Sequence, residues 1–275
     1  MVAPAKFIDV DFTKCEQYSR GYDPKPRQDY GVCRGAFADS FELVPESQWR
    51  EAADAQKKAG GGISRLVTRI YNQSNEGSCV GNAGCQGLEV LQARTVGKQN
   101  VVPISAMSLY KQIGSSPGSG AMVEDGVDRL YDTGVLPLDT PANKARFKHT
   151  MSHTNFRQPW PNGWKETAAL FKGVEGYICR SVNEMISALL RGMPVWVGRA
   201  GHSILYLEVV FEPELFVDYV NSWGQWGFGK GDFEFGFGRD SRRYYADSAD
   251  WCYALEAPEP SKWTWINDPN LSLAL

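Results

Sequence analysis

A cysteine, a histidine and an asparagine in this sequence could form a nucleophilic centre, and the cysteine has the most unusual surroundings. Cys79 follows the small and polar stretch NQSNEGS and precedes a segment with helix-like spacing of apolar residues. A thiol in the first turn of a helix faces unpaired backbone N–H groups and the positive end of the helix dipole, and both favour the attacking thiolate. We therefore predict that Cys79 is a nucleophile. The structural alternative is an inert, buried thiol, because free cysteine is among the most buried residue types.

Two later passages offer a base and a group to orient it. His202 opens the apolar run SILYLEVV and should lie where a strand begins, a position that suits a general base. Asn221 follows another apolar run, and its side chain can accept a ring N–H and hold the other ring nitrogen toward a thiol. Trp223 can exclude water from that contact. The alternatives are a structural or solvated histidine and an aromatic, glycine-rich turn region in NSWGQWGFGKG.

The residues around these candidates also fit a reactive centre. Gln73 lies six residues before Cys79 and carries an amide that can donate to a developing oxyanion. Gly77 and Ser78 are small and leave the sulfur approachable. We expect Ser203, next to the histidine, to shape the cleft.

Other motif-like passages do not indicate a cofactor. His149 and His153 are spaced like a metal pair, but no third ligand accompanies them, so we expect two solvated loop residues. The stretch GFGKG lacks the Ser or Thr that ends a phosphate loop. We expect neither a metal nor an organic cofactor.

The composition and net charge of the chain indicate which classes of partner to expect. The formal net charge of -3 gives no excess of basic residues for phosphates or anionic lipid, so we expect no nucleic-acid and no membrane partner. Without a recognisable secretory signal or apolar span, the chain is expected to be cytoplasmic, or packaged in a virus or phage particle. The six cysteines are scattered and are expected to be mostly buried thiols, although a Cys15–Cys33 bridge stays open.

The pattern of the chain changes along its length. Residues 1–44 are expected to form an extended arm with short strands or turns, 45–169 a helical lobe, and 170–275 a β-rich lobe. An irregular stretch with four prolines is expected at 134–165. The expected helices cover residues 46–59, 79–97, 105–114, 122–133 and 181–192, and the expected strands cover 63–73, 173–181, 194–200, 202–211, 214–223 and 231–238.

Taken together, the chemical passages resemble the papain-like cysteine peptidases. A Gln six residues before the Cys, a His at a strand start and the motif NSWG occur in the family's order, with 123 residues from Cys79 to His202 and 142 from Cys79 to Asn221. VPESQWRE looks like the start of the mature family enzymes, and NEMISALLRGMPVWVG looks like the helix and strand before their histidine. The resemblance covers roughly residues 45–240.

The resemblance implies a fold and a reaction. It implies an α+β, papain-like two-lobed fold, with a helical lobe, an antiparallel, barrel-like β lobe and the active-site cleft between them. Cys79 would be the nucleophile, His202 the acid and base, and Asn221 the orienting residue. Gln73 and the backbone N–H of Cys79 would form the oxyanion hole, and Trp223 would shield the histidine. The implied activity is a thiol endopeptidase acting on polypeptides.

Two departures from the family pattern leave an alternative open. Glu76 and Val80 stand where the family usually has a disulfide-forming cysteine and an aromatic residue. Glu76 could raise the pKa of Cys79 by like-charge repulsion if it faces the thiolate. Residues 1–44 do not resemble the family's helical prosegment, so the arm is expected to pack on the body or to dock a protein partner. A papain-fold binding or assembly module with weak or no turnover is therefore the second hypothesis, and a cell-wall peptide amidase the third.

Overall fold

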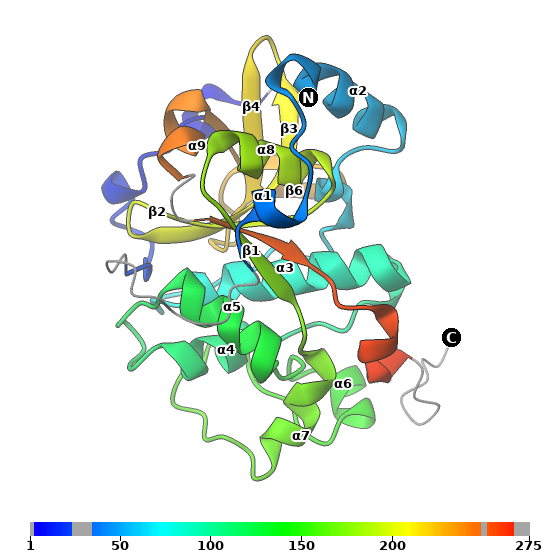
Figure 1. The fold of residues 1–275 in the computed structure, drawn as a ribbon. Helices are drawn as coiled ribbons and strands as arrows, with labels where there is room; N and C mark the ends of the chain where they lie inside the picture. Colours follow the sequence, from blue (N-terminus) through cyan, green and yellow to red (C-terminus); the bar gives the residue numbers. More distant parts are fainter. Residues whose placement is uncertain (1–2, 24–34, 249–251, 267–275) are drawn as a thin grey trace.

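The chain forms one antiparallel sheet with helices on both of its faces. The computed structural model describes residues 3–23, 35–248 and 252–266 (Figure 1). The helices are α1 (Phe37–Ser40), α2 (Trp49–Lys58), α3 (Cys79–Val96), α4 (Ala106–Ile113), α5 (Val123–Asp132), α6 (Pro141–Arg146), α7 (Trp164–Ala168), α8 (Val182–Leu190) and α9 (Arg242–Ser248). The strands are β1 (Glu175–Cys179), β2 (Val195–Arg199), β3 (His202–Phe211), β4 (Leu215–Val220), β5 (Phe228–Lys230), β6 (Phe233–Ser241) and β7 (Cys252–Glu256).

The order of strands in the sheet is β1-β7-β2-β3-β4-β6-β5, and each neighbouring pair is antiparallel. β3 begins at His202 and pairs with β4, whose last residue, Val220, lies opposite Leu205. In an antiparallel pair, one strand ends near the point where its neighbour begins. The residue after β4 therefore lies near the first residue of β3. This arrangement brings Asn221 to His202. The predicted α+β class and antiparallel sheet are confirmed.

Helix α3 runs across the middle of the molecule, with the sheet on one side and helices α4, α6 and α7 on the other (Figure 1). Helix α5 lies beside α3 and also contacts β1 and β2. Residues 79–93 are all buried, which explains the many small residues in this helix. Trp196 of β2 fits between α3 and α5 because both helices carry a glycine there. A methyl group on Gly84 would lie 2.4 Å from the Trp196 ring, and one on Gly126 would lie 2.2 Å from it.

Two hydrophobic clusters form the core. One joins α3, α4 and α5 to one face of the sheet and includes Trp263 and Trp265, while Trp251 lies outside the described residues. The other lies on the opposite face and joins α8 and α2 to residues of β2, β3 and β4. Trp49 at the start of α2 belongs to this second cluster.

The predicted helices are confirmed, and two of their caps follow the expected chemistry. The Ser105 hydroxyl accepts the Ser108 N–H at the start of α4. At the start of α8, the Ser181 hydroxyl accepts the Glu184 N–H and donates to the Glu184 carboxylate, which also accepts the Arg180 N–H; this is a variant of the capping box.

Two sequence-based expectations about local structure are wrong. Residues 63–73 do not form a strand: Ile63–Leu66 is a 3₁₀ turn, and among the described residues the rest pairs with a strand-like partner only at Asn72, opposite Trp223. The segment lies along α3 instead of at a sheet edge, so its alternating pattern buries side chains without forming a ladder. The stretch 134–165 is not wholly irregular, because Thr140 caps α6 by accepting the Asn143 N–H.

Candidate active site

Cys79 is the first residue of α3 and is completely buried. The residue before it, Ser78, is held by the Asn82 side chain, which donates to the Ser78 carbonyl at 2.8 Å and to its hydroxyl at 3.0 Å. The backbone N–H groups of Ser203, Gly21 and Val80 lie near enough to the Cys79 sulfur to lower the pKa of its thiol. Because Ser203 follows His202 in β3, the start of this strand lies near the sulfur.

His202 is fixed by its neighbours from the sheet. Its Nε2 lies 2.8 Å from Asn221 Oδ1, and the Asn221 oxygen also accepts the Ser222 N–H at 2.7 Å. The Trp223 ring stacks on the imidazole, with ring centroids 4.4 Å apart. His202 Nδ1 is buried and has no hydrogen-bond partner among the residues that the structure describes. The ring is therefore oriented through Nε2, and Nδ1 is available to a reacting group.

Gln73 is connected to the same part of the sheet. Its Oε1 accepts the Ser222 hydroxyl at 2.6 Å, and its backbone N–H donates to the Ser222 carbonyl at 2.9 Å. These bonds leave the Nε2 amide free to donate elsewhere, and it donates to the carbonyls of Ser19 and Glu76, both at 2.9 Å. Ser222 was missed in the sequence, although it stands inside the NSWG motif.

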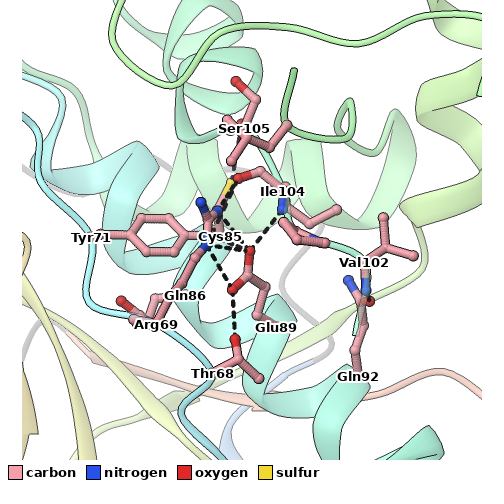
Figure 2. A network of polar contacts seen from close by, with 12 residues as sticks. Thr68, Arg69, Tyr71, Cys85, Gln86, Glu89, Gln92, Val102, Ile104 and Ser105 are labelled. Carbon is pink, nitrogen blue, oxygen red and sulfur yellow. Dashed lines mark hydrogen bonds and ion pairs between the residues drawn. The ribbon is translucent and has the colours of Figure 1, made fainter. Parts of the chain in front are cut away.

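A buried carboxylate fixes the segment that leads to Gln73 (Figure 2). Glu89 of α3 accepts from Tyr71 OH at 2.7 Å, from Arg69 Nη2 at 2.8 Å and from the Ile104 N–H at 2.7 Å. Thr68 donates to its other oxygen at 3.0 Å. Several donors on one desolvated carboxylate hold segment 68–71 against the helix that begins with Cys79. The sequence gives no signal for this network, because its members are 15 to 21 residues apart.

The N-terminal arm crosses the site. Gly21 passes so close to Gly77 that a methyl group on Gly21 would lie 1.7 Å from the Gly77 carbonyl oxygen. The Gly21 N–H donates to the Gly201 carbonyl at 3.2 Å, and the Gly21 carbonyl accepts the Ala121 N–H at 2.7 Å. The Gly21 N–H also faces the Cys79 sulfur. Gly21 of the arm thus lies close to the candidate nucleophile.

The arm also covers the histidine and the oxyanion donor. Phe12 packs edge-on against the His202 ring at 4.8 Å, and Tyr18 stacks on Trp223 at 4.5 Å. The Ser19 carbonyl accepts from both Gln73 Nε2 and Trp223 Nε1. Sequence reasoning missed Phe12, Tyr18 and Ser19, because no local pattern connects them to residues more than 50 positions away.

Burial determines the protonation states of Cys79 and His202. Burial raises the pKa of the Cys79 thiol to about 12, partly offset by the backbone N–H groups on the sulfur. Burial lowers the pKa of His202 to about 3, although the hydrogen bond to Asn221 opposes this shift. With the arm in place, the pair is therefore a neutral thiol and a neutral imidazole at pH 7, not a thiolate and an imidazolium.

The Glu76 carboxylate contacts the proline-rich stretch. Its carboxylate accepts the Phe156 N–H at 3.2 Å, and burial raises its own pKa. Burial is also the largest cause of the raised Cys79 pKa. Gly77 next to it donates its N–H to the Pro117 carbonyl and lines the path of the arm.

Ser203 is almost fully buried below the site. Its hydroxyl accepts from Trp196 Nε1 at 2.9 Å and donates to the Val197 carbonyl at 3.0 Å. Its backbone N–H lies near the Cys79 sulfur. The serine therefore fixes β2 and β3 beside the site.

The histidines in the proline-rich stretch are not solvated as expected. Both His153 ring nitrogens and His149 Nε2 are buried, and none of the three has a hydrogen-bond partner within the described part of the chain. His153 packs edge-on against Tyr71 at 4.7 Å, and burial lowers its pKa to about 3. The described residues contain no group of three or more His, Cys, Asp or Glu side chains placed to hold a metal ion.

Other sequence-based predictions concern the cysteines and membranes. Cys79, Cys85, Cys179 and Cys252 are buried free thiols, as expected for most of the cysteines. Cys15 is also a free thiol, so the possible bridge to Cys33, which lies outside the described residues, is not formed. In the described ranges, no helix has the length and apolar character needed to cross a membrane.

Comparisons with known proteins complete the description. Neither a protein-family model nor a curated protein sequence matches the chain. Among solved structures, it is similar to xylellain, a cysteine protease from Xylella fastidiosa, with 17% identity and a TM-score of 0.57 over 88% of this chain and 97% of that one. It is also similar to procathepsin L2 proteinase from the Tenebrio molitor larval midgut, with 15% identity and a TM-score of 0.57 over 89% and 79%.

A third similar structure is procathepsin B S9 from Trypanosoma congolense, with 11% identity and a TM-score of 0.51 over 91% of this chain and 89% of that one. At identities this low, structural similarity shows a shared fold, but it does not show a shared reaction. The fold implied by the sequence motifs is the fold observed. The chain therefore has a divergent papain-like fold, the fold of the cysteine proteases to which it is similar.

Proposed function

We propose that the chain is a thiol peptidase whose cleft is closed by its own N-terminal arm. The observation that carries the proposal is the His202 ring: Asn221 holds its Nε2, Trp223 shields it, and its Nδ1 is buried with no partner among the described residues. An imidazole with one nitrogen oriented and the other available is the arrangement that a general base needs.

The chemistry follows from the positions of these groups once the arm is displaced. His202 Nδ1 takes the thiol proton, and the Cys79 sulfur attacks a peptide carbonyl carbon. The oxygen that becomes negative accepts hydrogen bonds from Gln73 Nε2 and the Cys79 N–H. The C–N bond then breaks, and the amine leaves with the proton from Nδ1. Water activated by the same nitrogen hydrolyses the thioester and restores the thiol.

The closed arm is the reason to consider a second function. Segment 12–23 occupies the oxyanion donor and covers the sulfur, so the chain as it stands cannot accept a substrate. A binding or assembly module that keeps this state permanently would have the same structure. The two functions differ in what happens when the arm leaves.

A single glycine allows the arm to be displaced without truncation. Gly21→Ala places a methyl group 1.7 Å from the Gly77 carbonyl oxygen, so the arm must leave this position. Gly118→Ala is a matched control near the same site, because a methyl group there has nothing within 4 Å. Both variants are treated with iodoacetamide near neutral pH, and alkylation of each thiol is followed by peptide mapping.

We expect Gly21→Ala to alkylate first at Cys79 and to cleave denatured protein, with cleavage abolished in Gly21→Ala/Cys79→Ala. Gly118→Ala should behave like the wild type. Alkylation of Cys79 without any cleavage would favour the binding module. Equal reactivity of Cys79 and the other thiols in Gly21→Ala would remove the peptidase proposal altogether.

A further inference from the structure

Two cysteines outside the candidate active site lie opposite each other in the sheet. Cys179 is the last residue of β1, Cys252 is the first residue of β7, and the two are partners in the antiparallel β1–β7 ladder. Directly opposite residues of such a ladder place their side chains on the same face of the sheet. Both side chains belong to the hydrophobic cluster on the α8 face, and both residues are thiols in the structure.

The ladder sets the distance between the two cysteines. The Ile178 N–H donates to the Gly35 carbonyl at 3.1 Å, on the edge of β1 that faces away from β7. Because the amides of successive strand residues point to opposite edges, the Cys179 amide points toward β7, and Cys179 and Cys252 are a hydrogen-bonded pair. The Cα atoms of such a pair are about 5.5 Å apart, within the roughly 4.4 to 6.8 Å that a disulfide spans.

One of the two sulfur atoms already leans across the ladder. Cys252 Sγ lies 3.9 Å from the Cys179 carbonyl oxygen, so it is directed toward β1. Cys179 Sγ lies 4.0 Å from the carbonyl oxygen of Tyr177 in its own strand. The positions of the strands already suit a disulfide, so we expect rotation of the two side chains, without a change of register, to bring the sulfurs into bonding distance.

The place of the pair in the sheet gives an oxidant access to it. Both side chains are fully buried, so the thiols react only when the structure opens locally. β1 is at one end of the strand order, and the pair lies where β1 ends and β7 begins. The end of a ladder opens at a lower cost than its middle. In the closed structure, the same burial protects a disulfide from reductants.

We propose that Cys179 and Cys252 are a redox pair that a small disulfide, such as glutathione disulfide, converts into a cross-strand disulfide. One cysteine thiolate attacks a sulfur of glutathione disulfide, forms a mixed disulfide and releases one glutathione. The other cysteine thiolate attacks the sulfur of the first cysteine, forms the Cys179–Cys252 bond and releases the second glutathione. The two thiol protons pass to the two glutathiones, so the cysteines lose two electrons and glutathione disulfide gains them.

The disulfide closes a loop that contains α8 and strands β2 to β6, together with His202 and Asn221. A crosslink around a long loop stabilises a protein chiefly by restricting its unfolded chain. Oxidation therefore stabilises the half of the molecule that carries the candidate base without adding a contact to the cleft. This inference does not depend on the proposed function.

Oxidation of the folded full chain tests the pair. The wild type, Cys179→Ala, Cys252→Ala and Cys85→Ala are incubated with glutathione disulfide, and the remaining thiols are blocked with iodoacetamide. Peptide mapping without reductant then identifies linked peptides. We expect a Cys179–Cys252 peptide in the wild type and in Cys85→Ala, the matched control that removes an equally buried thiol, and we expect dithiothreitol to separate it.

The melting temperature tests the effect of the bond. Oxidation should raise the Tm of the wild type and of Cys85→Ala by at least about 4 °C, and it should leave the Tm of Cys179→Ala and Cys252→Ala unchanged. A linked peptide without a rise in Tm would refute the stabilising role.

The mapping of the wild type decides the proposal even if an alanine variant at one of these buried positions is unstable. Unreacted thiols at both positions, or glutathione held at one cysteine without a linked peptide, would overturn it. A linked peptide that forms only in urea-unfolded protein would also overturn it, because the folded ladder would then not close the bond.

Discussion

The groups of the candidate active site and the arm that covers them are held by different kinds of contact. Gln73, His202 and Asn221 are fixed by side-chain hydrogen bonds that only these residue types can make. Around Gly21 the arm is held by backbone hydrogen bonds to Gly201 and Ala121. Backbone groups are the same in every peptide, so another peptide could replace the arm around Gly21. The site residues, in contrast, form a permanent framework. The following changes test that distinction.

The framework should be most sensitive at Glu89. Glu89→Ala removes a buried carboxylate and leaves Arg69 without its ion-pair partner, so we expect the free energy of unfolding to fall by about 3 to 5 kcal/mol. Urea unfolding measures the change. Glu166→Ala, which breaks an exposed pair with Lys148, is the control and should cost less than about 1 kcal/mol. A similar small loss at Glu89 would contradict the framework role.

Gln73 is part of the candidate site and also binds the arm. Its removal should therefore lower turnover but raise the rate at which Cys79 is alkylated. Gln73→Ala in the Gly21→Ala background removes an oxyanion donor, and we expect kcat to fall by about 10² to 10³. In the otherwise unchanged chain, the same substitution removes the bond to the Ser19 carbonyl and should speed alkylation of Cys79. Turnover on a peptide substrate and the alkylation rate are measured side by side. A parallel change in both would show that Gln73 only supports the local structure.

The closed arm should depend on pH in a predictable direction. Burial lowers the His202 pKa from 6.5 to about 3, helped by the positive charges of Arg199 and Arg20. An imidazole that the arm no longer covers takes up a proton more readily than the covered one, so closure should weaken as the pH falls below about 6.5.

The Cys79 thiol makes arm closure depend on pH in the alkaline range. The pKa of Cys79 is raised from 9.0 to about 12, so closure also weakens as the pH rises from 9.0 toward 12. Hydrogen-exchange protection factors of the Tyr22 and Asp23 amides should be highest between these limits. His202→Gln should flatten the acid side of the profile, and an unchanged acid side would assign the effect to another group.

The smallest expected effect comes from an aromatic contact of the arm. Tyr18→Ala removes the ring stacked on Trp223, which is worth about 0.5 to 1.5 kcal/mol, so the open fraction should rise about 2- to 12-fold. The rate of Cys79 alkylation reports the change. Tyr18→Phe keeps the stacked ring and should match the wild type. A larger effect than that of Gly21→Ala would place the main anchor of the arm at Trp223.

The residues of the candidate site were accessible from the sequence because each has a local signature. Cys79 starts a helix of small residues, His202 starts an apolar strand, and Asn221 precedes Trp223 after another strand. Their roles remain proposals, but the structure brings the histidine and the asparagine together at 2.8 Å. Strand order alone could have predicted this meeting once β3 and β4 were recognised as neighbours.

The path of the arm could not be predicted in this way. Gly21 meets Gly77 and Gly201 through backbone atoms, and backbone contacts leave no pattern of residue types. The strand expected at 63–73 failed for a related reason. A pattern of alternating side chains predicts which of them are buried, but not whether a strand edge is available; here Tyr71 and Arg69 bind Glu89 of a helix instead.

The Trp196 side chain limits how this cleft can open. Its ring lies against the bare Cα atoms of Gly84 in α3 and Gly126 in α5, so β2 and these two helices interlock without space for sliding. A hinge motion that separates the sheet from the helices would break the buried packing of Trp196 against Gly84 and Gly126. Under the proposed function, access of a peptide to Cys79 should follow the detachment of the arm and not a separation of the sheet from these helices.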